Sequence, residues 1–175
     1  MIEIVFDKHT TEYSININLS SRVNDNISMK LDTGSPISVI CVQNLKQITQ
    51  EPWSKLVEKI DSIKDDKDNI LHLGVYGNSL NHLEVQQDDD KNKNKYRDFI
   101  PYVIKDIVIG GQKIPCFIFW VDVTNYKDRS EITSTLFGFD NMCIGEKWFD
   151  DNDNFHIKVN ELFNQNIFRN CKEIN

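Results

Sequence analysis

The sequence has few of the residues that build metal sites or disulfide scaffolds, and it has no long hydrophobic run. Its four cysteines are widely separated and match no CxxC or zinc-ligand spacing, so we expect free thiols. Its four histidines contain no pair at the i, i+4 spacing of a helical metal site, and we expect no metal. The longest apolar run, Cys116 to Val121, is too short for a bilayer, which takes about 20 residues, so we expect no membrane partner.

The chain also lacks an excess of basic residues. Its formal net charge is -7, which gives the wrong sign of electrostatic attraction for a dedicated nucleic-acid binder. A protein partner is the better expectation. The first residues, Met1 to Lys8, contain no basic region followed by an apolar core, so we expect no secretory signal and a cytoplasmic location.

No internal repeat is visible, which argues against a solenoid or a second lobe. With 175 residues, of which 39% are hydrophobic and 10% aromatic, the chain suits one globular domain with a real core. We therefore expect a single domain over residues 1–175. The charge-rich run at about 86–98 has no apolar anchor and is interpreted as a solvated loop insertion, and the chain from about 150 as a carboxyl-terminal extension.

The most informative feature that is present is Asp32-Thr33-Gly34-Ser35, between two apolar runs that favour strands. A carboxylate at the end of a strand, followed by a hydroxyl residue and a glycine, allows a tight turn whose amides and hydroxyls converge on the acid. Hydrolysis by such an acid needs two carboxylates about 3 Å apart that share one proton. Because the sequence has no second Asp-Thr-Gly or Asp-Ser-Gly, the second carboxylate must come from another copy of the chain.

The rest of the chain reads as mainly β. Residues 12–19 alternate like a half-buried strand, and a turn-rich stretch at 20–26 predicts a hairpin that leads into the Asp32 loop. Two apolar runs in 70–85 predict a second hairpin, and two strong runs joined by Gly110-Gly111 predict a third. Apolar residues between Trp53 and Ile63 recur at spacings of three and four after Pro52, which predicts a helix.

Three segments give the sequence a resemblance to the retropepsin-like (retroviral-type) aspartic proteases. They are the active-site motif Leu31–Ser35, the hairpin tip Tyr76–Ser79 and the apolar-apolar-glycine sequence Leu136–Asp140. The resemblance spans roughly residues 12–142. It implies a single-lobe acid-protease fold, a closed β-barrel with a few short helices, working as a two-fold homodimer on a polypeptide substrate without a cofactor.

The resemblance also implies a role for each matching residue. Asp32 would supply one carboxylate of the shared pair, Thr33 would hydrogen-bond across the two-fold axis, Gly34 would allow close backbone approach, and Ser35 would donate to the outer carboxylate oxygen. A mobile flap would bind substrate through Tyr76, Gly77 and Asn78. The active-site loop would be supported from beneath by Leu136, Phe137 and Gly138.

Further expectations concern the two ends of the chain. After Asp140 the resemblance implies a short helix, for which Asn141 to Phe149 is the candidate. Residues 155–159 are predicted to form a strand and residues 161–169 a helix. Met1 to Phe6 is a candidate for the interleaved terminal sheet that joins the two chains in retroviral members.

Three functions stay open at this point. The first is an aspartic endopeptidase that uses Asp32 from each protomer. The second is a catalytically silent dimerisation or peptide-binding module with the same fold, because fold does not fix function. The third is a latent protease that its own carboxyl-terminal segment restrains. A simpler interpretation of Asp32-Thr33-Gly34 is a strand-turn corner built from ordinary turn residues.

Overall fold

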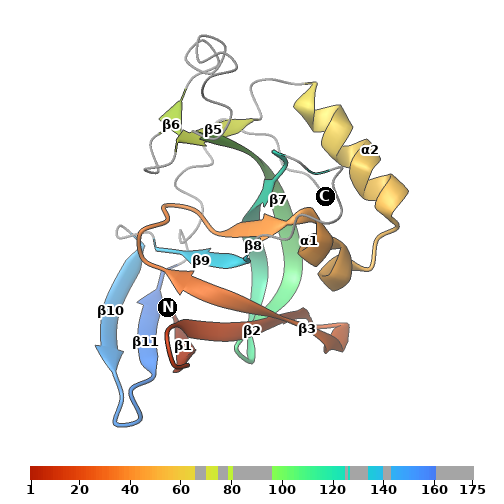
Figure 1. The fold of residues 1–175 in the computed structure, drawn as a ribbon. Helices are drawn as coiled ribbons and strands as arrows, with labels where there is room; N and C mark the ends of the chain where they lie inside the picture. The colour runs from red at the N-terminus through yellow and green to blue at the C-terminus, as the bar shows by residue number, and fades with distance from the viewer. Residues whose placement is uncertain are drawn as a thin grey trace.

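The computed structural model describes residues 1–65, 70–74, 79–80, 96–124, 126, 134–139 and 143–160, and they form one mainly β structure (Figure 1). In chain order its elements are β1 (Ile2–Lys8), β2 (Tyr13–Leu19), β3 (Arg22–Asp32), β4 (Val39–Cys41), α1 (Val42–Thr49), α2 (Trp53–Lys64), β5 (Leu71–Gly74), β6 (Ser79–Leu80), β7 (Tyr96–Ile109), β8 (Gln112–Asp122), β9 (Leu136–Gly138), β10 (Ile144–Phe149) and β11 (Phe155–Val159).

Six of the strands close into a barrel, in the order β2-β3-β9-β4-β8-β7, with β7 returning to β2. Most neighbours are antiparallel, but β9 runs parallel to β3 and β4 runs parallel to β8. The predicted mainly β closed barrel with short helices is therefore confirmed. In Figure 1 the two helices lie on one side of the barrel and the β10–β11 hairpin lies on the opposite side.

Two of the predicted hairpins are present, with one change of boundary. β7 and β8 pair antiparallel along most of their length and are joined by Gly110-Gly111. Both glycines have positive φ, 56° and 82°, which suits the tight turns that match the twist of paired strands. In the first hairpin β3 begins at Arg22, so the connection after Leu19 is shorter than the predicted turn at 20–26.

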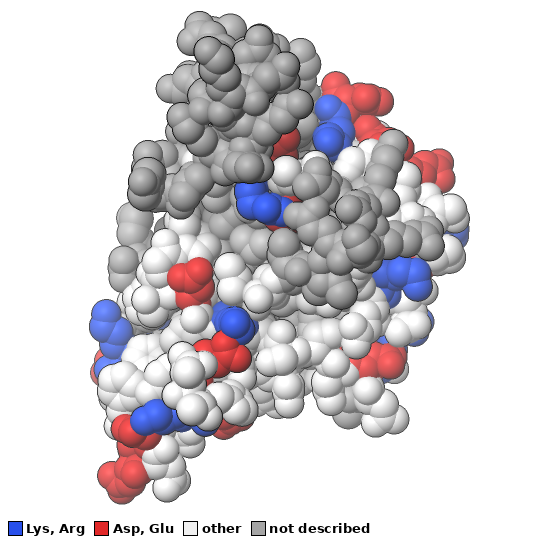
Figure 2. Space-filling model, in the orientation of Figure 1, with Lys and Arg blue, Asp and Glu red and all other residues white. Residues whose placement is uncertain are grey.

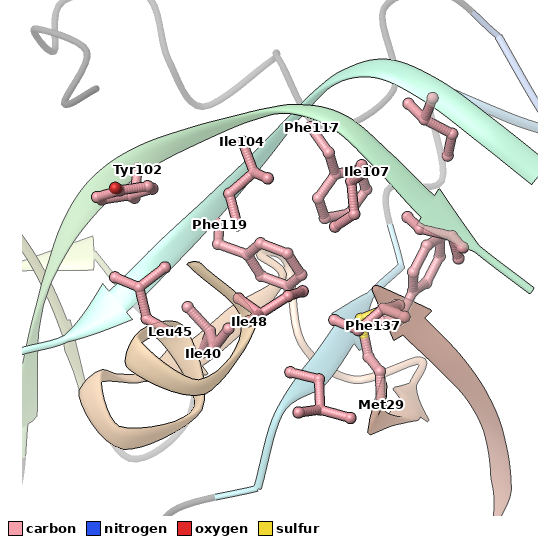
Figure 3. Packing of buried hydrophobic residues seen from close by; sticks show 14 of the residues in the cluster. Met29, Ile40, Leu45, Ile48, Tyr102, Ile104, Ile107, Phe117, Phe119 and Phe137 are labelled. Atoms are coloured by element: carbon pink, nitrogen blue, oxygen red, sulfur yellow. The ribbon is translucent and has the colours of Figure 1, made fainter. Parts of the chain in front are cut away.

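The predicted helix is α2, which begins directly after Pro52 and buries Leu56 and Ile60. The sequence did not predict α1, which buries one side formed by Val42, Leu45 and Ile48. Figure 3 shows Leu45 and Ile48 on the helix side that faces the barrel core. The buried residues of α1 recur at a spacing of three, which is a helical signal, but α1 has only eight residues.

The main core fills the barrel with aliphatic and aromatic side chains. Figure 3 shows Met29, Ile40, Leu45, Ile48, Tyr102, Ile104, Ile107, Phe117, Phe119 and Phe137 converging between β7, β8, β9, β3 and α1. Phe117 lies between two aromatic neighbours, with ring centroids 4.8 Å from Phe119 and 6.1 Å from Phe137. This packing joins β9, the parallel neighbour of β3, to the centre of the barrel.

The chain after the site differs from prediction. Residues 144–149 form strand β10 rather than the expected helix over Asn141 to Phe149. β10 pairs with β11 through a turn in which the Asp150 carboxylate accepts the N–H groups of Asn152 and Asn154 at 2.8 and 3.0 Å. The Asp- and Asn-rich stretch 150–154 between two apolar runs is a hairpin signal that the helix prediction overlooked.

The two ends of the described chain meet in one sheet. Residues Ile2 to Phe6 of β1 pair antiparallel with Phe155 to Val159 of β11 in the same chain. The expected extension from about residue 150 thus begins with the predicted strand at 155–159, which lies beside β1. Residues 2–6 of the segment expected at an interface between chains pair with β11 of the same chain.

The second hairpin is described only at its base. β5 pairs with β6 and also with β7, at Leu71 to Gly74 opposite Phe99 to Tyr96. Residues 76–78 of the proposed flap tip lie outside the described residues, as do residues 86–95 of the charged loop and the predicted helix at 161–169. Residues 96–98, assigned to that loop from the sequence, begin β7.

Candidate active site

Asp32 is the last residue of β3, and its side chain is half-buried where the strand meets an exposed turn. The Gly34 N–H donates to the Asp32 Oδ1 at 3.0 Å, and the Ser35 N–H donates to the Asp32 carbonyl at 3.2 Å. These two hydrogen bonds fold the turn back on the acid. Thr33 and Gly34 form its exposed outer part.

β9 supports this turn from below. Its Leu136, Phe137 and Gly138 run parallel to Lys30, Leu31 and Asp32, and Gly138 lies opposite Asp32. The Phe139 N–H donates to the Ser35 carbonyl at 2.8 Å, which joins the end of β9 to the turn. The structure thus brings the active-site motif and the apolar-apolar-glycine sequence together.

Gly138 lies against the backbone of Ile37. A Cβ at Gly138 would be 2.2 Å from both the carbonyl carbon and the carbonyl oxygen of Ile37. Only glycine allows this approach without moving one backbone segment. Beside it, Phe137 is fully buried and packs edge-on against Phe6 at 5.0 Å between ring centroids. The support beneath Asp32 is therefore tightly packed.

Ser35 does not make the contact that the resemblance implies. Its hydroxyl donates to the Ile37 carbonyl at 2.7 Å instead of to the Asp32 carboxylate. A serine hydroxyl has one hydrogen to donate, so it cannot serve both acceptors. The expectation for Ser35 is wrong in this structure, because the turn brings the carbonyl of Ile37 within reach of the hydroxyl.

The backbone conformation of the single chain does not require glycine at position 34. Its φ is not positive, and a Cβ there would have Asp32 Oδ1 as its near neighbour, at 3.4 Å. That distance is tolerable for a real side chain. Any need for glycine at this position arises from something that approaches the exposed turn.

A second, smaller apolar cluster connects the segment after the turn to the β5–β6 hairpin. It is formed by Ile37, Val39, Leu73, Phe99 and Trp120, with Leu71 and Leu136 packed against it. The cluster therefore joins β4 and β9, beside the Asp32 turn, to β5 and β7. We did not predict it, because its members come from runs that are far apart in the sequence.

Polar contacts beside this cluster tie β5, β7 and β8 together. The buried His72 ring lies 2.5 Å from Asp98 through Nδ1. Arg97 donates through Nε to the buried Asp122 carboxylate at 2.6 Å, and Asp122 also accepts the Thr124 N–H at 3.1 Å. These contacts hold β5 against β7 and β7 against β8. No sequence motif marks them, since each contact joins residues of different strands or of a strand and its following turn.

The expected flap residues Tyr76, Gly77 and Asn78 lie outside the described residues, so the structure does not place them relative to Asp32. Among the described residues there is no group of three or more His, Cys, Asp or Glu side chains that could hold a metal ion. No helix in the described part of the chain is long and apolar enough to cross a membrane. On the face shown in Figure 2, basic and acidic side chains are interspersed.

No family model matches the sequence, and no curated protein matches it. Among solved structures, the chain is similar to a retropepsin-like aspartic protease from Rickettsia conorii, with 14% identity and a TM-score of 0.46. The similarity covers 89% of this chain and 90% of that chain. A likeness at this level does not by itself establish an activity.

Proposed function

We propose that this protein is an aspartic endopeptidase whose active site forms when two copies of the chain bring their Asp32 carboxylates together. The observation that carries the proposal is the turn itself. Asp32 ends a barrel strand, receives the Gly34 N–H on Oδ1, and is opposed by Gly138 of a tightly packed parallel strand. A simple surface corner needs none of this support.

The homodimer follows from the need for a second acid. One chain supplies one Asp-Thr-Gly, and the exposed Thr33 and Gly34 lie where a second chain can reach them. A two-fold axis beside this turn would place one Asp32 against the other. In an isologous interface of this kind each contact occurs twice, once from each chain. Thr33 would hydrogen-bond across the axis, and Gly34 would allow the two backbones to approach.

The chemistry of the pair is that of two carboxylates that share one proton. Two like charges about 3 Å apart cannot both ionise, so one member stays protonated over a broad pH range. The ionised carboxylate takes a proton from a bound water, which attacks the scissile carbonyl. The protonated carboxyl polarises the carbonyl oxygen and donates its proton to it as the water adds. The proton taken from the water then passes to the amide nitrogen as the C–N bond breaks. No nucleophilic side chain takes part.

We propose a polypeptide in extended conformation as the substrate. The hairpin that starts at β5 would cover it with Tyr76, Gly77 and Asn78, which would exclude water and hold the substrate backbone. The contacts between His72 and Asp98 and between Arg97 and Asp122 support the base of that hairpin. The rest of the barrel then serves as a rigid base for a moving cover.

The contact of Ser35 favours a second candidate, a catalytically silent peptide-binding or dimerisation module. The Ser35 hydroxyl donates to the Ile37 carbonyl, so it does not stabilise the Asp32 carboxylate. Without that donor, the ionised acid has one hydrogen bond fewer than the resemblance implies. In this alternative the same turn dimerises or binds a peptide but does not cleave it.

The test is cleavage of a diverse peptide library by the wild type and by Asp32→Asn, from acidic to neutral pH, with a pepstatin-type inhibitor as a further control. Asp25→Asn is the matched variant, because Asp25 lies on the same strand away from the turn. We expect cleavage by the wild type and by Asp25→Asn and none by Asp32→Asn. Sedimentation of all three proteins should give the same dimer.

The outcomes separate the candidates. Retained turnover in Asp32→Asn would move the catalytic role to another residue. A dimer that binds peptides and cleaves none would establish the silent module. A protein that stays monomeric at all cellular concentrations would remove the shared active site altogether.

A further inference from the structure

Ser38 is a buried serine at the end of the segment that leaves the Asp32 turn, and it is only 2% exposed. Its hydroxyl accepts the Gly138 N–H at 2.9 Å, although the two residues are 100 positions apart in the sequence. Its backbone carbonyl accepts the Trp120 N–H at 2.8 Å. One small residue therefore contacts both β9 and β8.

The hydroxyl occupies the place of a missing backbone acceptor. β9 has β3 on one edge and β4 on the other, but β4 and β9 share only the register pair Val39 and Leu136. Alternate residues of a strand direct their backbone groups to the same edge, so the Gly138 N–H faces the β4 side two residues further on. There the Ser38 hydroxyl is its acceptor. A buried N–H without an acceptor is costly, so this contact holds Gly138 in place.

Gly138 in turn lies opposite Asp32. The β3–β9 register places the two residues side by side, and the next residue, Phe139, donates its N–H to the Ser35 carbonyl. The backbone of Gly138 is also pressed against Ile37, so it cannot move toward that side. A shift of Gly138 would therefore move the strand edge on which Asp32 rests.

We propose that Ser38 is a positioning residue for Asp32, acting through the amide of Gly138. The proposal rests on the proposed function, because it concerns the position of the Asp32 carboxylate relative to Asp32 of the second chain. Ser38 is buried, so it would act through Gly138 rather than on the substrate. A displacement on the order of 1 Å at the reacting group can lower turnover on the order of 100-fold, so a remote hydrogen bond can control the rate.

The test uses a matched pair of variants, Ser38→Thr and Ser38→Val. Their side chains have nearly the same shape, but only threonine keeps the hydroxyl. Ser38→Ala is the second deletion variant, in case the larger side chains do not fit. Ser14→Ala is the control, because Ser14 is another buried serine and lies on β2 opposite Lys30.

Two measurements are made on each protein. The first is kcat and KM on a peptide that the wild type cleaves. The second, which needs no activity, is the titration of the Asp32 carboxyl carbon and the exchange rate of the Gly138 amide by nuclear magnetic resonance. If Ser38 contributed to stability alone, the Asp32 titration of the folded variants would be that of the wild type. Their kcat and KM would also be unchanged.

We expect Ser38→Val and Ser38→Ala to lower kcat by about 10- to 100-fold with KM within about twofold, to shift the Asp32 titration and to speed Gly138 exchange. Ser38→Thr and Ser14→Ala should match the wild type. An unchanged Asp32 titration in the deletion variants, or a wild-type kcat in Ser38→Ala, would overturn the proposal. If the wild type cleaves no peptide, the proposed function fails, and the titration still decides whether Ser38 positions Asp32.

Discussion

An alanine at Gly34 should separate the folding of one chain from the assembly of two. In the single chain the new Cβ would lie 3.4 Å from Asp32 Oδ1, and the backbone φ is not in the left-handed region. Neither feature is a source of strain. Replacing glycine also restricts the unfolded chain, which stabilises by about 0.4–1 kcal/mol where the native conformation suits alanine. The free energy of unfolding of the monomer should therefore change by less than about 1 kcal/mol.

Assembly should respond differently, because the two-fold axis of the proposed dimer passes beside this turn. The Cβ added at position 34 of each chain would lie between the two turns, and the two-fold symmetry would produce the same clash from both chains. We expect the dimer dissociation constant to rise by at least about tenfold, which corresponds to about 1.4 kcal/mol, and cleavage to fall with it. Sedimentation over a range of concentrations measures the first effect, and urea unfolding of the dilute monomer measures stability.

The control for this experiment is Gly111→Ala. Gly111 has open space around it but a φ of 82°, so alanine there is strained without meeting another atom. It should lower stability by about 1 kcal/mol and leave dimerisation unchanged. A Gly34→Ala protein that dimerises and cleaves like the wild type would refute the placement of the axis at this turn.

Two further predictions concern stability. Gly138→Ala should destabilise by about 3 kcal/mol or more, since its Cβ would lie 2.2 Å from the Ile37 carbonyl; a urea midpoint like that of the wild type would contradict this close packing. The hydrogen bonds from His156 to Asp150 and Glu3 raise the pKa of His156 above its ordinary 6.5. The stabilisation from charged His156 is therefore complete below about pH 6.5 and is lost as the pH rises through the folded pKa. The stability difference between wild type and His156→Gln should shrink toward alkaline pH. His9→Gln is the control, and a difference that stays constant with pH would refute the charged contact.

Local patterns were enough to predict the long hairpins and α2. The β7–β8 hairpin follows from two strong apolar runs around Gly110-Gly111, and both glycines have the positive φ that such a turn needs. α2 follows from apolar residues at helical spacing after Pro52. In each case the signal lies within a short stretch of sequence, so no distant contact was needed to predict it.

The errors occur where a short element depends on its neighbours. α1 follows directly on the apolar strand β4 and is capped at its start by the Cys41 sulfur, which accepts the Asn44 N–H at 3.4 Å. Cysteine is not among the preferred capping residues, so no start signal was visible. β10 has an irregular register between Ile144 and Lys147, which breaks the alternation that identifies a strand.

The candidate site was predictable as a motif but not as a set of contacts. The sequence Asp32-Thr33-Gly34 predicted the candidate acid, and the family resemblance predicted that Leu136 to Gly138 lie beneath it, where the structure has them. The hydroxyl contacts of Ser35 and Ser38 depend on where the turn places Ile37 and Gly138. Such distances are set by tertiary packing, which residue spacing along the chain does not encode.

The contacts around Asp32 also weigh against the simplest interpretation of its motif. A strand-turn corner needs only its own hydrogen bonds, such as the one from the Ser35 N–H to the Asp32 carbonyl. This turn is held in addition by a parallel strand, by a glycine pressed against Ile37 and by a buried serine hydroxyl, all on the side away from solvent. Its outer side, Thr33 and Gly34, is exposed and has no conformational need for glycine. Support on the inner side and a small residue on the outer side are what an acid requires if a second chain must approach it closely. Dimerisation is therefore the property that distinguishes this site from a simple strand-turn corner, and the comparison of the wild type with Asp32→Asn decides whether the dimer catalyses.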